Sequence, residues 1–229
     1  MCDSPAMMDA IRAGLVNGAR ADVPGDLQER SEHIKAFGYF ADAAMVGIGP
    51  MVEGARLQRP WRNPDIDRLA EDLKTRQTKT LASGIDVIMA DLKESIQTPP
   101  SSIDGQDYAI VFLFEHNRPA RRNEPGAEWI LDAQDHRACL RATEAAVGLA
   151  SYLRLLGYAS RMHTSSTSDV DLNTLAVAAG LASVENGALV APYIGTDFGL
   201  AVVTTSMQMA TDKPLASMAV QPWFKTQGP

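Results

Sequence analysis

Apolar residues along the chain fall into short runs and helical stripes, which predict a mixture of strands and helices. A continuous apolar run, 108–114, is bounded by acidic residues and predicts a strand that is buried on both faces. Shorter apolar runs predict further strands at 44–48, 159–163, 188–191 and 198–205. Because strands and helices follow one another without regular strand–helix–strand units, the pattern favours an α+β fold.

Helical periodicity predicts three helices, of which the second is the longest and central. They span residues 26–40, about 132–157, and 172–181. Asp26 is the expected N-cap of the first helix and Gly157 the expected C-cap of the second. The third helix is capped by either Asp169 or Asp171.

The remaining segments give weaker patterns. Residues 58–79 contain two prolines and several arginines, and predict an irregular excursion followed by a helix. Residues 84–96 fit either a buried strand or the buried face of a helix. The run 163–168 is rich in hydroxyl side chains, which can bind a ligand or form a polar loop that caps a helix.

Composition narrows the possible functions. The 229 residues carry a formal net charge of −7 and no basic block, which argues against a nucleic-acid partner. Two cysteines cannot form a four-thiolate metal site, and no apolar run reaches the roughly 18 residues that a membrane helix needs. We therefore expect a cytoplasmic domain with a small molecule or a protein as its partner, and no metal site.

Candidate catalytic residues are few. The sequence contains no nucleophile elbow, Walker loop or dinucleotide fingerprint, and none of the four histidines belongs to a paired metal-binding motif. Asp135 lies beside His136 near the start of the long helix and is a candidate catalytic carboxylate. The alternative is that Asp135 only stabilises the first turn, because a carboxylate interacts favourably with the helix dipole there.

Several short motifs follow one another in order along the chain. The second half contains, in order, Leu153-Arg-Leu-Leu-Gly-Tyr158, the helix from Asp171 to Leu181, Asn186-Gly187, Pro192-Tyr193, Gly195, and Thr211-Asp-Lys-Pro-Leu215. The first half contributes Ile34-Lys-Ala-Phe-Gly38, Val46-Gly-Ile48 and the apolar strand at 108–114. This ordered set resembles the corrinoid-binding region of reductive dehalogenases and the related epoxyqueuosine reductases.

The resemblance implies a nitroreductase-like sandwich of a mixed or antiparallel sheet with helices, which in active relatives binds cobalamin. It divides the chain into an N-terminal extension (1–25), the corrinoid-type domain (26–216) and a tail (217–229) in which Trp223 and Phe224 are expected to dock. The corresponding cofactor surface is expected at Ser165, Ser166, Asn173, Asn186, Gly187, Tyr193 and Phe198, with Asp135 as the nearest match to a catalytic aspartate.

The chain departs from this pattern at three places. It has Gly180-Leu181-Ala182 where the family has Gly-Leu-Gly. Glu185 precedes the Asn-Gly turn where the family has a basic residue, and it would repel a corrin phosphate. No cysteine follows Leu215, whereas each [4Fe–4S] cluster of the electron relay needs about four. The chain thus resembles a degenerate copy of the corrinoid domain, or a stand-alone relative without the iron–sulfur domain.

Three functions remain open at the level of sequence. The first is a corrinoid-binding domain without its own electron relay, either functional or vestigial, which as an enzyme would need an external electron donor. The second is a flavin-binding oxidoreductase of the nitroreductase type, holding FMN. The third is a structural dimerisation module. For each we expect a homodimer that buries on the order of 2,000 Å² or more.

Overall fold

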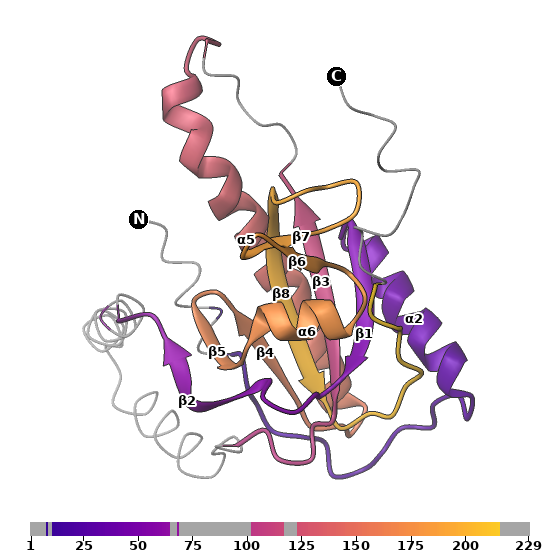
Figure 1. Cartoon of the computed structure of the whole chain (residues 1–229). Coiled ribbons are helices and arrows are strands. Elements are labelled where there is room, and N and C mark those ends of the chain that lie inside the picture. The colour runs from indigo at the N-terminus through magenta and orange to yellow at the C-terminus, as the bar shows by residue number, and fades with distance from the viewer. Residues whose placement is uncertain (1–7, 9–10, 65–67, 69–101, 117–122, 216–229) are drawn as a thin grey trace, which may run out of the picture.

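The computed structural model describes residues 8, 11–64, 68, 102–116 and 123–215 (Figure 1). Its centre is a four-stranded sheet in the order β1-β3-β8-β4, in which every neighbouring pair is antiparallel. The strands are β1 (Met45–Pro50), β3 (Tyr108–Glu115), β8 (Phe198–Thr205) and β4 (Ser160–Thr164). The predicted α+β class and the four strands are confirmed, and β1 extends through the expected turn to Pro50.

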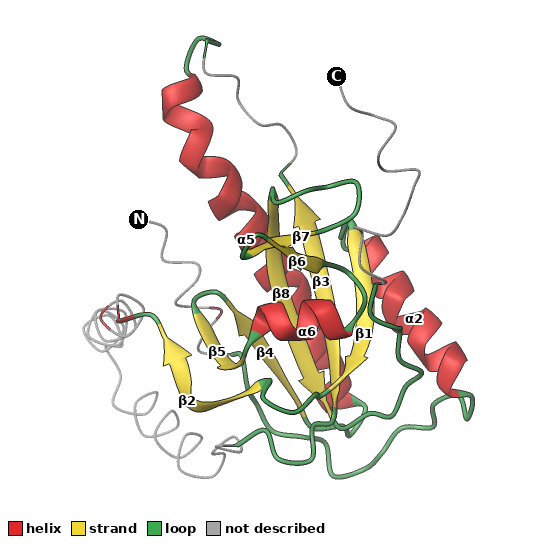
Figure 2. Ribbon diagram, viewed as in Figure 1, coloured by secondary structure: helices red, strands yellow, loops and turns green. Residues whose placement is uncertain are grey.

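Both faces of this sheet are buried, which explains the continuous apolar run in β3. Ile110 and Phe112 join Val203 in one core, against the helices α2 (Leu27–Phe40) and α5 (Ala127–Leu155). The alternate residues Val111 and Leu113 belong to a second core, against the helix α6 (Leu172–Ala178). The domain therefore has three layers, with α5 and α2 behind the sheet and α6 in front of it in the view of Figure 2.

The three predicted helices are present, with shifted ends. α2 (Leu27–Phe40) is capped by Asp26, and α6 (Leu172–Ala178) is capped by Asp171, whose carboxylate accepts from the Asn173 N–H. α6 is shorter than the predicted 172–181. The long helix α5 is Ala127–Leu155, so the expected start near 132 was wrong: Gly126, at φ 78°, ends the preceding turn. Gly157 follows the helix at φ 86°, as expected of a C-terminal glycine.

Two small antiparallel pairs complete the described fold. β6 (Ser183–Glu185) and β7 (Ala188–Val190) form a hairpin around the predicted Asn-Gly turn. β2 (Arg56–Arg62) pairs with β5 (Thr167–Val170), with a shift of register between Arg56 and Trp61.

The second pair corrects two predictions. The irregular excursion expected from residue 58 begins as a strand, and Pro60 is tolerated there because it lies in the stretch where the pairing register shifts. The hydroxyl-rich loop expected at 163–168 is largely strand: only Ser165 and Ser166 lie between β4 and β5. Asp169 therefore lies within a strand and caps no helix.

The N-terminal segment packs on the domain along β4 and the end of α5. The Met162 N–H donates to the Arg12 carbonyl, and the Ala21 N–H donates to the Leu156 carbonyl. The Arg20 guanidinium lies 5.1 Å from the centre of the Tyr158 ring. Residues 11–21 thus cover the edge of the sheet.

Several sequence predictions lie outside the described residues. These are the helix expected before residue 79, the ambiguous segment 84–96, and the tail with Trp223 and Phe224. Among the helices that the structure describes, none combines the length and the apolar character needed to cross a bilayer.

Candidate functional site

A pocket of about 290 Å³ opens at the start of β8, between α5, α6 and the turn that joins β4 to β5. Its lining mixes polar and apolar side chains from elements that are far apart in the sequence. The lining residues are Asp135, Cys139, Ser165, Leu172, Asn173, Leu189, Thr196, Phe198 and Leu200.

Gly199 in β8 allows α5 to pack closely against the strand on one side of this pocket. A Cβ built on Gly199 would lie 2.5 Å from the carbonyl carbon of Ala138 and 2.6 Å from the Cys139 nitrogen, closer than real Cβ atoms approach other atoms. The α5 backbone therefore rests directly on β8 at this residue. As a result, Asp135 and Cys139, one helical turn apart on α5, lie beside Phe198 and Leu200.

The polar part of the pocket centres on the Asp135 carboxylate. The Cys139 thiol lies 3.7 Å from Asp135 Oδ1 and donates a weak hydrogen bond to it. His116 Nε2 lies 3.8 Å from the same oxygen, too far for a hydrogen bond. Burial and the nearby Asp135 charge raise the pKa of Cys139 to about 11, so the thiol stays protonated at neutral pH and is a poor nucleophile.

The structure brings together half of the residues that the sequence suggested for a site. Asp135, Ser165, Asn173 and Phe198 all line the pocket. Ser166, the neighbour of Ser165, is not part of the lining; its carbonyl accepts from the Asn63 N–H.

The other three suggested residues lie on surfaces outside the lining. Asn186 and Gly187 form the exposed tip of the β6–β7 hairpin, at φ 49° and 82°. Tyr193 is 85% exposed at φ 67°. The pocket residues that sequence reasoning missed are Cys139, Leu172, Leu189, Thr196 and Leu200. Only Cys139 carried a signal, since it lies four residues after Asp135 on a predicted helix.

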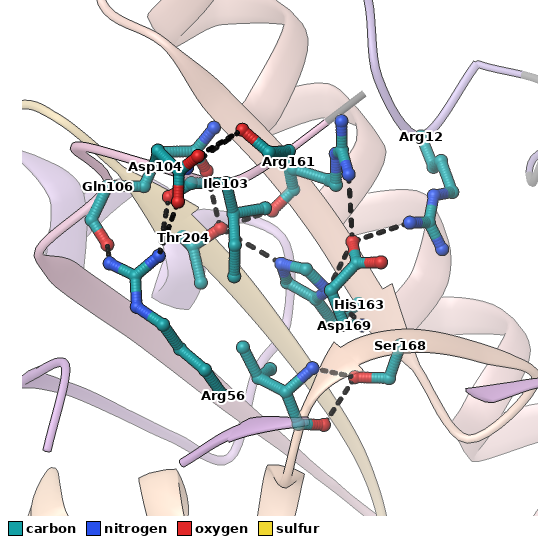
Figure 3. A network of polar contacts seen from close by, with 12 residues as sticks. Arg12, Arg56, Ile103, Asp104, Gln106, Arg161, His163, Ser168, Asp169 and Thr204 are labelled. Carbon is teal, nitrogen blue, oxygen red and sulfur yellow. Dashed lines mark hydrogen bonds and ion pairs between the residues drawn. The ribbon is translucent and has the colours of Figure 1, made fainter. Parts of the chain in front are cut away.

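A second polar cluster is buried under the N-terminal segment (Figure 3). Asp169 Oδ2 pairs with Arg12 at 2.5 Å and with Arg161 at 3.0 Å. Although burial opposes ionisation, the two guanidinium groups dominate and hold the pKa of Asp169 below its ordinary value. This carboxylate therefore links residue 12 to the strands β4 and β5.

His163 continues the cluster into the sheet (Figure 3). Its Nδ1 accepts from the Asp169 backbone N–H, so Nε2 carries the proton and donates to Thr204 Oγ1 at 2.9 Å. Thr204 in turn donates to Gln106 Oε1 at 2.6 Å. Every polar atom of the His163 ring is satisfied inside the protein, which indicates a structural role rather than a catalytic one.

Comparisons with known proteins address the fold. No protein-family model and no curated protein matches the sequence. Among solved structures, the catabolic reductive dehalogenase NpRdhA matches with 33% identity and a TM-score of 0.66, over 93% of this chain and 25% of that one. The chain is thus similar to part of a reductive dehalogenase. A second dehalogenase structure, described as suggesting a mechanism for B12-dependent dehalogenation, matches with the same identity and TM-score.

The likeness to epoxyqueuosine reductases is much weaker. The enzyme from Streptococcus thermophilus aligns over 81% of this chain with 11% identity and a TM-score of 0.43, which is too low to support an argument. The predicted resemblance to reductive dehalogenases is confirmed, while this chain spans only a quarter of the length of the solved dehalogenase.

Proposed function

We propose that the chain is a non-catalytic, reductive-dehalogenase-like domain whose pocket serves a ligand smaller than a corrinoid. The observation that carries this proposal is the pocket itself. Four of the suggested site residues line a space of about 290 Å³, and none of its described lining residues is a lysine or arginine.

Size is the first argument. Pockets that enclose drug-sized ligands measure roughly 300–1,000 Å³. A corrinoid, with its macrocycle and nucleotide loop, is far larger than such ligands. The pocket between α5, α6 and β8 lies at the lower end of that range, and so matches a ligand of a few rings at most.

Charge is the second argument. A corrinoid nucleotide loop and FMN both carry a phosphate, which proteins bind with Arg, Lys or clustered backbone N–H groups. Among the described residues of the lining, the one charged side chain is the carboxylate of Asp135, which repels a phosphate. Glu185, exposed next to the β6–β7 turn, adds a second negative charge where the dehalogenase pattern has a basic residue. The same charges disfavour the flavin alternative.

The cysteine content gives the third argument. The sequence holds two cysteines, and Cys139 is bound within the pocket to Asp135 rather than grouped with other ligands. One [4Fe–4S] cluster needs about four thiolates, so these two cysteines cannot hold a cluster by themselves. The proposal of a binding module rests on the fold and the pocket.

A titration tests the proposal. Purified protein at micromolar concentration is mixed with hydroxocobalamin, with cob(II)alamin and with FMN, and the visible spectrum of each is recorded. We expect no spectral shift and no comigration of the coloured ligand through gel filtration, while circular dichroism confirms the folded state. A saturable shift of either corrinoid spectrum would contradict the proposal, and a bound yellow flavin would favour the nitroreductase alternative.

A further inference from the structure

The Asp135 carboxylate is incompletely neutralised. In the described part of the chain its polar contacts are the weak thiol donor of Cys139 at 3.7 Å and the His116 ring nitrogen at 3.8 Å. Within the described part of the chain, no lysine or arginine lies within ion-pair distance of it. The side chain is 65% exposed and lines the pocket, so a ligand in the pocket can reach the carboxylate.

The other polar groups in the pocket do not offset this charge. Ser165 and Thr196 contribute hydroxyls, Asn173 contributes an amide, and the Cys139 thiol is protonated at neutral pH. The described part of the lining therefore holds one negative charge among neutral hydrogen-bonding groups. Because the Asp135 side chain is largely exposed, water and salt screen its charge, and its effect on a charged ligand is strongest at low ionic strength.

Apolar side chains form the remaining walls. Leu172, Leu189, Phe198 and Leu200 are half-buried and pack against the second core, so their positions are fixed by the fold. A ligand that touches them buries apolar surface, while a charged end of the same ligand can reach Asp135.

We propose that this pocket binds a small organic cation, with an ammonium group against Asp135 and an apolar body of about one ring against Phe198 and the leucines. An anionic ligand of the same shape is rejected by Asp135, and a neutral one lacks the ion pair. This inference rests on the proposed function, since it requires that the pocket serve a ligand smaller than a corrinoid.

The test compares three probes of one shape: 2-phenylethylammonium, 2-phenylethanol and phenylacetate. Ligand-observed NMR at pH 7 and low salt gives the affinity of each for the full chain. We expect the ammonium to bind at least tenfold more tightly than phenylacetate, with the alcohol between them. In Asp135→Asn the preference for the ammonium over the alcohol should disappear. The matched control is Glu144→Gln, which removes the same charge from an exposed position elsewhere on α5 and should keep the preference.

Results that differ from these expectations contradict the inference that the pocket binds an organic cation. Equal affinity for the ammonium and phenylacetate contradicts it, as does unchanged ammonium binding in Asp135→Asn or equal loss in Glu144→Gln. If none of the three probes binds, the cation-binding inference is also contradicted. In that case the proposed function is still supported, provided that cobalamin does not bind either. Displacement of the ammonium by hydroxocobalamin would instead refute the proposed function.

Discussion

Burial of His163 predicts a specific loss of stability in mild acid. The ring is completely buried, and this burial lowers its pKa from 6.5 to about 3, with the Arg12 and Arg161 charges acting in the same direction against the opposite effect of Asp169. Between these two values the unfolded chain binds a proton at residue 163 that the folded protein does not bind. Stability is therefore full above pH 6.5 and falls as the pH is lowered towards 3.

The magnitude follows from the two pKa values. With an unfolded pKa of 6.5 and a folded value well below 5, lowering the pH from 7 to 5 costs about 2 kcal/mol through His163 alone. Asp169 contributes little in this window, because its ordinary pKa is 3.8 and its folded pKa is lower still. Against a typical unfolding free energy of 5–15 kcal/mol this loss is measurable.

Urea unfolding followed by circular dichroism at pH 7 and pH 5 measures the effect. His163→Gln removes the titrating group, so its loss of stability between the two pH values should be smaller than that of the wild type by about 2 kcal/mol. His33→Gln, at an exposed position on α2, is the control and should behave as the wild type.

If His163→Gln does not fold, the imidazole nitrogen shifts of the wild-type protein decide the question. They should stay unchanged from pH 7 to pH 5, with the proton on Nε2. A His163 resonance that titrates above pH 5 in the folded protein would refute the reasoning, as would identical pH dependence in wild type and His163→Gln.

Three further predictions concern packing, capping and assembly. Gly199→Ala should destabilise the protein by about 1–3 kcal/mol in urea unfolding, because its Cβ meets the α5 backbone, whereas Gly18→Ala has open space and should change stability by less than about 0.5 kcal/mol. Equal effects of these two variants would contradict the close approach of α5 to β8. Asp171→Ala should cost about 1 kcal/mol by the same assay, since the carboxylate caps α6, and an unchanged unfolding midpoint would argue against this cap. The expected homodimer remains a prediction, which light scattering coupled to size exclusion tests: a mass near 49 kDa, twice the 24.7 kDa of the chain, supports it and a monomer mass contradicts it.

The sequence predicted those parts of the fold whose signals are local. β3 and β8 are continuous apolar runs because the sheet is covered on both faces, and Asp26 is a cap that acts within its own helix. By contrast, the polar residues of β5 predict a loop. Its Asp169 is neutralised by Arg161 and also by Arg12, and Arg12 is 157 residues away in the sequence. Such long-range ion pairs leave no local pattern.

Part of the candidate site was also predictable, because some of its residues carry a local signal in the sequence. Asp135, Ser165, Asn173 and Phe198 were suggested by hydroxyl content and by the dehalogenase resemblance, and all four line one pocket. Leu189 and the other apolar walls belong to ordinary short runs, and nothing in such a run distinguishes a pocket wall from a core residue. Their role follows only from how α6, β7 and β8 meet in three dimensions.

The central claim, that this dehalogenase-like domain does not hold an intact corrinoid, is tested most directly by counting cobalt. The protein is incubated with excess hydroxocobalamin, freed of unbound ligand by gel filtration, and analysed for cobalt by mass spectrometry. We predict far less than one cobalt per ten chains. Close to one cobalt per chain would contradict the claim.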